Sequence, residues 1–448
     1  MSTTLTPWIG LAAVAGMTGM LLVSLAAVWH HTDLPRETLR KVFHLGGGAI
    51  ALSLPWLFHR LWPVLLLGGV SALAFVMLRM VPKLKHGVGQ VLHGVSRSSM
   101  GEFWFLLGVA TVFAIASQDI VLYSISILIL AVSDTTAALI GTAYGRHQFE
   151  VAGGLKSAEG SLGFLLSAFL CVYLPLLLFT DIGQLESALM AANVAILLTL
   201  AEAGATRGTD NFVVPVAVLV LLKVFLGMSA ADLAVQLGVL VMLGSLVFVL
   251  RRHTGLSVDA LFSALLVGYL SWSFGDWRWM ITPVLLFAIY SLVIRPPRLD
   301  AAPPFGATVV MAVAVPGTAL VTVRALFHSD VLYLPYVAAW GANLAVIGTL
   351  ARQFEHPATP GWRAASLDVA RALLVILPGV AVAPYCNPPW LIATLLTAPV
   401  ALAMFAIMGR SGRFDPKRSA AWMRVPTAVS FGTLLCFGLS GLWLGRAG

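Results

Sequence analysis

The chain has 448 residues, of which 59% are hydrophobic and 10% are charged, and its formal net charge is +8. About a quarter of the residues in an ordinary soluble domain are charged, so one water-soluble core could not bury this much apolar surface. The positive charge fits basic loops that face anionic lipid head groups, and no nucleic-acid partner is expected. The composition therefore predicts a membrane protein.

Apolar runs follow one another from Trp8 to Leu444, each close to the roughly 20 residues that a spanning helix needs. The first run has no basic segment before it, which favours a spanning helix over a cleaved signal peptide. The pattern predicts an all-α fold, a polytopic transmembrane helix bundle of about 16 spans. The predicted spans are 7–29, 45–59, 61–80, 103–117, 119–144, 159–180, 186–203, 211–227, 230–250, 256–273, 278–294, 305–325, 330–351, 366–384, 389–409 and 425–444.

Lysine and arginine indicate how these spans are oriented. With the N-terminus outside, about 22 of the 27 basic residues fall in inside loops, as the positive-inside rule requires. This arrangement predicts an integral protein of a bacterial inner (plasma) membrane. Two inside segments, Asp33–His44 and Lys83–Arg97, mix apolar and basic residues and are predicted to be short interfacial helices.

Polar motifs thin out after Arg251, which predicts two parts of the chain. Residues 1–250 form the predicted catalytic transmembrane unit, and residues 251–448 form a second transmembrane unit. Polar residues at helix ends in a membrane protein are costly and mark candidate sites.

The first two polar clusters precede predicted spans. Arg40, Lys41 and His44 stand before three glycines, either as a membrane anchor with close helix packing or as a clamp for phosphate. Arg97 and Glu102 flank a helix start, where a capping box with an anchoring arginine is the alternative to a catalytic role.

The third cluster combines a carboxylate with a glycine-rich loop. Asp134 lies in a predicted span after an unbroken apolar run, so it needs a cation or a metal ion nearby. The following loop carries glycines, a lysine, hydroxyl groups and a helix start, which together can hold phosphate, although a flexible loop with a helix cap is the alternative. The candidate nucleotide-binding residues are Gly141, Gly145, Gly154, Lys156, Ser157, Glu159, Gly160 and Ser161.

The fourth cluster contains Glu202, Asp210 and Asn211. Either Asp210 or Asn211 caps the next helix, or both supply oxygen ligands to Mg²⁺ together with Asp134. All four clusters fall on the cytoplasmic side of the predicted topology. Their convergence predicts one site for a nucleotide and a carboxylate-bound metal ion, next to a lipid substrate.

At these residues the chain resembles the polyprenol kinase family, which includes dolichol kinase and phytol kinase and is related to phosphatidate cytidylyltransferase. The resemblance covers about residues 30–227. It implies that CTP phosphorylates an isoprenoid lipid alcohol with the help of Mg²⁺. The motifs are Arg40-Lys41-x-x-His44, Arg97-Ser98-x-x-Gly101-Glu102, Asp134-x-x-Ala137-x-x-x-Gly141, Lys156-Ser157-x-Glu159-Gly160-Ser161 and Asp210-Asn211-x-x-x-Pro215.

In this kinase hypothesis, Asp134 holds Mg²⁺ or positions the alcohol, and Lys156 and Ser157 bind the donor phosphates. Arg40, Lys41 and Arg97 then neutralise the charge that develops during transfer. Glu102 and His44 complete the candidate catalytic set. A cytidylyltransferase that forms a CDP-lipid, and a transporter, are the alternative hypotheses; the choice between CTP and ATP and the formation of a homo-oligomer stay open.

The second unit departs from this pattern. Its start, from Gly255 to Trp279, weakly resembles the phytyl-phosphate kinase family, which implies a second phosphorylation. No catalytic motif follows residue 300, and the acidic residues there are interpreted as isolated. These residues are Asp300, Asp330, Glu355, Asp368 and Asp415.

Overall fold

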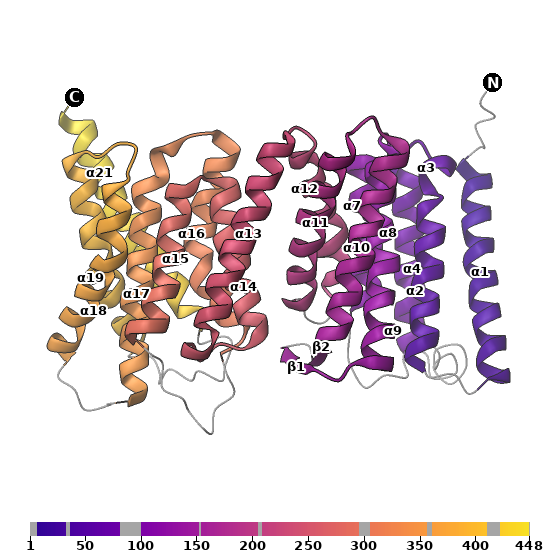
Figure 1. The fold of residues 1–448 in the computed structure, drawn as a ribbon, viewed down its shortest axis with the longest axis horizontal. Helices are drawn as coiled ribbons and strands as arrows, with labels where there is room; N and C mark the ends of the chain where they lie inside the picture. The colour runs from indigo at the N-terminus through magenta and orange to yellow at the C-terminus, as the bar shows by residue number, and fades with distance from the viewer. Residues whose placement is uncertain are drawn as a thin grey trace. The chain divides into compact units, whose positions relative to one another are not determined.

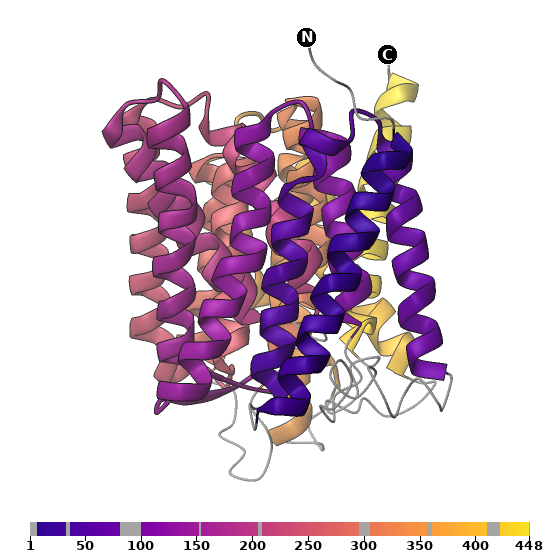
Figure 2. The same ribbon diagram turned by 90° about the vertical axis from the view of Figure 1, so that its right-hand side faces the viewer.

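The computed structural model describes residues 7–32, 36–80, 100–151, 154–204, 208–294, 305–355, 361–409 and 422–447. These residues are almost entirely helical, and they form two compact units (Figure 1). Unit 1 is Met1–Leu237 and unit 2 is Gly238–Gly448. Within each unit the helices run side by side, as Figures 1 and 2 show.

Unit 1 contains the first helices and one short hairpin. A continuous helix from Ile120 to Tyr144 is made of α8, the π-helical segment η1 and α9. The elements are α1 (Pro7–His31), α2 (Arg36–Leu52), α3 (Leu54–Leu57), α4 (Leu61–Met80), α7 (Gly101–Ala116), α8 (Ile120–Leu128), η1 (Ile129–Ser133), α9 (Asp134–Tyr144), β1 (Gln148–Val151), β2 (Gly154–Ser157), α10 (Ala158–Phe179), α11 (Gln184–Gly204), α12 (Asp210–Phe225) and α13 (Ala230–Leu250).

The boundary between the units falls within α13. Unit 2 then contains η2 (Arg251–His253), α14 (Val258–Phe274), α15 (Trp277–Ile289), η3 (Tyr290–Ile294), α16 (Ala307–Phe327), η4 (Asp330–Leu332), α17 (Tyr333–Glu355), α18 (Gly361–Ala381), α19 (Pro388–Gly409) and α21 (Arg424–Ala447). The sequence predicts a division at residue 250, and the catalytic role assigned to the first part stays a prediction.

Most of these helices are apolar on every side, which suits helices surrounded by lipid and by each other. In the described part of the chain, ten are long and apolar enough to cross a membrane. Three shorter apolar helices, Leu61–Met77, Gly101–Ala116 and Val258–Phe274, fall below that length. The polytopic helical fold is thus confirmed, whereas the count of about 16 spans is not.

The segment before the second span differs from its prediction. Asp33–His44 was expected to be a separate interfacial helix, but α2 runs without a break from Arg36 to Leu52. No proline interrupts it before Pro55, so the turn that carries Lys41 and His44 is part of the packed bundle. The other predicted interfacial helix, Lys83–Arg97, lies outside the described residues.

Close contacts through glycine fix α2 and α7 in unit 1. A Cβ atom on Gly48 would lie 2.2 Å from the Cβ of Ala131, so α2 approaches η1 as closely as a glycine allows. A Cβ atom on Gly108 would lie 2.5 Å from the carbonyl oxygen of Asn211, which brings α7 equally close to α12. These contacts bring together the helix ends that carry the polar clusters.

Candidate active site at one end of unit 1

Asp134 follows directly after the π-helical segment η1, which interrupts the regular helix just before the carboxylate. Such segments are frequent at functional sites, because they redirect a side chain without ending the helix. The Nζ atom of Lys41 lies 2.6 Å from Oδ2 of Asp134, and Lys41 is only 5% exposed. Nε2 of His44 lies 3.4 Å from the same oxygen and 3.0 Å from the carbonyl oxygen of Leu130. The first and third predicted clusters therefore meet at Asp134.

A second ion pair joins the hairpin to α11. The Nζ atom of Lys156 lies 2.6 Å from Oε1 of Glu202 and also donates a hydrogen bond to the Glu202 carbonyl oxygen. Glu202 is buried near the C-terminal end of α11, and Lys156 is half-buried. The two residues are 46 positions apart in the sequence. The fold therefore brings the lysine of the predicted phosphate loop to a carboxylate of the fourth cluster.

Asp210 connects these two ion pairs. It interacts electrostatically with both carboxylates and both lysines, that is, with Asp134, Glu202, Lys156 and Lys41. Four charged groups from α2, α9, β2 and α11 thus lie within electrostatic range of Asp210 at the start of α12. In this arrangement, each lysine offsets the negative charge of the carboxylate with which it pairs.

Capping of α12 by Asp210 or Asn211 was the alternative to a metal-binding role, and the structure does not support this alternative. Thr209 is the N-cap residue and makes no side-chain cap bond, while Asp210 and Asn211 lie in the first turn of the helix. The amide of Asn211 instead donates a hydrogen bond of 3.0 Å to the carbonyl oxygen of Gly101 at the start of α7. Asn211 therefore fixes the end of α7 beside the site.

The predicted glycine-rich loop contains a two-stranded antiparallel hairpin. In its register Phe149 pairs with Lys156, and Gln148 pairs with Ser157. Because side chains alternate across a strand, Lys156 points to the opposite face from Leu155 and Ser157. The hairpin lies at the same end of unit 1 as the C-terminal end of α9 (Figure 1). It gives the lysine a defined direction, which a flexible loop would not.

Three of the predicted nucleotide-binding residues have packing contacts. Ser157 is the N-cap of α10, and its Oγ accepts a hydrogen bond of 3.1 Å from the amide of Gly160. A Cβ atom on Gly160 would lie 2.8 Å from the carbonyl oxygen of Ala137, and one on Gly145 would lie 2.9 Å from the Cβ of Ser157. These glycines allow α9 and α10 to pack closely, whatever else they bind.

The remaining candidates are placed as follows. Glu159 pairs with His147, whose Nδ1 lies 2.7 Å from its carboxylate. Arg40 interacts electrostatically with Asp134, and Glu102 lies in the first turn of α7. Gly154 is the first residue of β2. Arg97 lies outside the described residues.

The donor set can be tested against Mg²⁺. No three His, Cys, Asp or Glu side chains in the described part of the chain lie close enough to hold a metal ion by themselves. Mg²⁺ is commonly held by one or two carboxylates together with substrate phosphates, so Asp134 and Asp210 fit this requirement. Buried hydroxyl oxygens of Thr135 and Ser161 have no hydrogen-bond partner among the described residues, and they could accept one from a ligand.

Glu202 was named in the fourth cluster but was not chosen as a site residue. The signal that could have found it is the one that identified Asp134, a carboxylate near the end of an apolar helix that needs a cation. Its partner Lys156 could not be assigned, because nothing in the spacing relates residues of β2 to α11. Only the packing of α10 against α11 makes that contact.

Two acidic residues of unit 2 that were interpreted as isolated are in fact paired. Asp368 is fully buried and contacts Arg352, and Asp330 lies 3.1 Å from Nε of Arg324. Asp368 finds its partner on the neighbouring helix α17, and Asp330 finds its partner near the end of α16. The spacing of residues in the sequence does not reveal such contacts. Asp300 and Asp415 lie outside the described residues.

Comparisons with known proteins agree on one class of enzyme. The chain is 30% identical to a phytol kinase of Synechocystis sp. over 216 residues, which are 46% of this chain and 88% of that protein. It is 27% identical to the CTP-dependent diacylglycerol kinase 1 of Schizosaccharomyces pombe over 160 residues, which are 34% of this chain and 72% of that protein. No family model and no solved structure matches the chain. With 88% of the phytol kinase covered, this chain belongs to the polyprenol kinase family of membrane enzymes, and it is a lipid kinase.

Proposed function

We propose that unit 1 transfers the γ-phosphoryl group of CTP to the hydroxyl group of an isoprenoid lipid alcohol. The observation that carries the proposal is the pair of lysine–carboxylate contacts, Lys41 with Asp134 and Lys156 with Glu202, all four of which interact electrostatically with Asp210. The two relatives support the substrates: one is named for phytol and the other for its dependence on CTP.

The site suits phosphoryl transfer because this reaction depends mainly on positioning and on neutralising charge. Lysine carries three N–H donors, and within the described residues Lys156 directs two of them to Glu202. The third can reach a phosphate oxygen of the donor without breaking the pair. Glu202 would thus orient Lys156 toward the nucleotide, as Asp134 orients Lys41.

In the proposed reaction, the alcohol oxygen forms a bond to the γ-phosphorus, and the bond from that phosphorus to the bridging oxygen breaks. CDP leaves with the bonding electrons, and the alcohol proton passes to a carboxylate. Asp210 is suited to bind the metal ion, because it has no ion pair at salt-bridge distance among the described residues. Mg²⁺, held by Asp134 and Asp210 with the donor phosphates, would supply additional positive charge at the transferred group.

The proposed site faces the cytoplasm, and the N-terminus lies outside. The support is the distribution of basic residues in the sequence, which places the hairpin on the inside. Cysteine labelling tests this: Arg146 before β1 and Asp181 before α11 are both exposed, and they lie at opposite ends of α10. In a cysteine-free background, only Asp181→Cys should react with an impermeant reagent in intact cells. If only Arg146→Cys reacts, the protein has the opposite orientation in the membrane.

The reaction itself is tested with purified protein and CTP labelled on the γ-phosphate. We expect label in the lipid and release of CDP with phytol or a polyprenol as acceptor. Diacylglycerol belongs in the same panel, because one relative is a diacylglycerol kinase. Label only in pyrophosphate, with cytidine in the lipid, would replace the proposal with a CDP-lipid synthase. Equal rates with ATP would refute the assignment of CTP.

A further inference from the structure

The π-helical segment η1 lies directly before Asp134 and changes the hydrogen bonding of the backbone there. In an α-helix, the N–H of Asp134 would bond to the carbonyl oxygen of Leu130, four residues earlier. In a π-helical turn an N–H reaches back five residues, so the N–H of Asp134 would reach Ile129 instead. Leu130 is buried, and a buried carbonyl oxygen without a donor is costly. The carbonyl oxygen of Leu130 therefore needs a donor from elsewhere.

His44 of α2 is placed to supply this donor. Its Nε2 atom lies 3.0 Å from the carbonyl oxygen of Leu130 and 3.4 Å from Oδ2 of Asp134. A carbonyl oxygen can only accept a hydrogen bond, so Nε2 carries the hydrogen atom and cannot take up another proton. The ring also packs edge-on against Phe105 of α7, with the two ring centroids 5.2 Å apart. His44 is thus held in one orientation, with Nε2 as a donor.

The same face of α2 also contacts the carboxylate itself. Lys41 precedes His44 by three positions and Gly48 follows it by four, so the three residues lie on one side of the helix. Lys41 pairs with Asp134, and Gly48 lets α2 approach η1 closely. One face of α2 therefore holds both Asp134 and the turn that precedes it.

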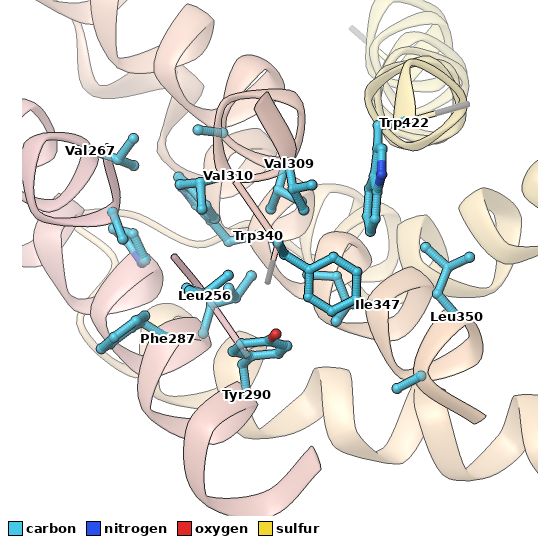
Figure 3. Close-up of a pocket in the computed structure, with 17 residues that line it drawn as sticks. Leu256, Val267, Phe287, Tyr290, Val309, Val310, Trp340, Ile347, Leu350 and Trp422 are labelled. Carbon is cyan, nitrogen blue, oxygen red and sulfur yellow. The ribbon is translucent and has the colours of Figure 1, made fainter. Parts of the chain in front are cut away.

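Another π-helical segment, η3 in unit 2, is bonded in a different way. The hydroxyl of Ser291 donates a hydrogen bond of 2.7 Å to the carbonyl oxygen of Phe287, four residues earlier in the same helix. Phe287 and Tyr290 line an apolar pocket there (Figure 3), and none of the described residues that line it is charged. The bond of His44 to η1 instead spans 86 positions of the sequence and lies beside an ion pair. The long-range donor is therefore a feature of the candidate site.

We infer that His44 is a positioning residue, which holds the π-helical turn of η1 and so directs the carboxylate of Asp134, and which takes up no proton in the reaction. A π-helical turn contains about one residue more than an α-helical turn, so its loss would rotate Asp134 by roughly 100° about the helix axis. The carboxylate would then turn away from Lys41. The inference rests on the proposed function for the role of Asp134, whereas the bond to Leu130 does not depend on that function.

Two substitutions of His44 separate positioning from proton transfer in the assay with labelled CTP. His44→Leu removes the donor, and kcat should fall by about 10- to 100-fold, as expected when a reacting group is misplaced. His44→Gln keeps an N–H donor and has no basic nitrogen, so its kcat should stay within about fivefold of the wild type. The KM for CTP should change by less than about threefold in both variants, because the donor phosphates are assigned to Lys156.

Tyr123→Phe is the matched control for the packing of α2. The hydroxyl of Tyr123 donates a hydrogen bond of 2.7 Å to the carbonyl oxygen of Ala51, which joins α8 to α2 before η1 begins. Its kcat should stay within about twofold of the wild type. A loss as large as that of His44→Leu would overturn the inference, because any contact between these helices would then matter equally. Equal losses in His44→Gln and His44→Leu would also overturn it, since they would show that the imidazole itself takes part.

Nitrogen NMR tests the bond to Leu130 without any measurement of activity. The full chain is labelled in the ring nitrogens of histidine and studied without nucleotide or lipid alcohol. The signals that disappear in His44→Gln belong to His44, and they should show a hydrogen atom on Nε2. An Nε2 without hydrogen would overturn the inference even if the wild-type protein transfers phosphate. If the wild type transfers none, the proposed function fails, and the NMR result still decides whether His44 is the donor.

Discussion

The two units bury charged residues in different ways. In unit 1, Lys41 and Asp134 are 93 residues apart, and Lys156 and Glu202 are 46 residues apart. In unit 2, Arg352 and Asp368 are 16 residues apart, and they join two consecutive helices. Unit 1 thus collects charges from separate elements at one place, whereas unit 2 pairs neighbours along the chain.

The choice of cation also differs between the units. Unit 1 uses lysine, a compact charge with three rotatable donors, which can hold a carboxylate and still reach a substrate phosphate. Unit 2 uses arginine, whose planar fork suits fixed pairing and phosphate oxygens. Charges that converge from distant positions therefore indicate a reacting site, and charges paired locally indicate binding or support.

The largest effect is expected for Asp134→Asn. Removal of the carboxylate leaves Lys41 buried without its anion and removes an oxygen ligand for the metal ion. We expect kcat to fall at least about 100-fold, which is about 2.7 kcal/mol of barrier. The measurement is transfer of label from γ-labelled CTP to lipid.

Asp119→Asn is the matched control for this variant. Asp119 is the N-cap at the other end of the same continuous helix, and asparagine caps a helix equally well. Its turnover should stay within about twofold of the wild type. If Asp134→Asn lowers turnover by less than about tenfold, Asp134 has only a packing role.

The next effect concerns the pair of Lys156 and Glu202. Lys156→Ala and Glu202→Gln should each lower kcat/KM for CTP by about 10- to 100-fold. If Glu202 acts by orienting Lys156, the double variant should lose no more than the worse single variant, because the two changes remove one shared function.

Glu186→Gln serves as the control, since Glu186 lies in the first turn of the same helix, α11. It should leave kcat/KM unchanged. Losses that add in full in the double variant would show that Glu202 and Lys156 act independently, and they would contradict the orienting role.

Asp259→Asn in unit 2 tests whether any buried aspartate would behave like Asp134. Asp259 is 1% exposed and accepts hydrogen bonds from the hydroxyl of Ser257 and, at 3.0 Å, from the amide of Ala307. Asparagine would lose one of these acceptors, so we expect the free energy of unfolding to fall by about 1–3 kcal/mol. Turnover should stay within about threefold.

Thermal unfolding in detergent and the labelled-CTP assay measure both quantities on the same preparation. A fall in turnover as large as that of Asp134→Asn, at unchanged stability, would contradict the comparison. It would place a catalytic carboxylate in unit 2.

The sequence predicted the membrane fold well, because apolar runs long enough to span a bilayer leave few alternatives. It also identified the carboxylate at Asp134, since a charge in an apolar helix is conspicuous. It could not assign partners: the contact of Lys156 with Glu202 depends on how α10 packs against α11. The hairpin was missed because its two strands have four residues each, too short for a clear alternating pattern.

The smallest effect is expected where a helix cap and a site residue coincide. Ser157 caps α10 in unit 1. Ser257 stands at the N-cap position of α14 in unit 2, where its hydroxyl donates a hydrogen bond to Asp259 and makes no cap bond, so Ser→Ala should cost each about 1 kcal/mol of stability. Only Ser157 adjoins Lys156, so only Ser157→Ala should also lower turnover, by about three- to tenfold, because the end of β2 loses its anchor. Ser157→Thr, which keeps the hydroxyl, should restore most of that loss. Equal turnover of Ser157→Ala and Ser257→Ala would mean that the cap of α10 positions nothing at the site.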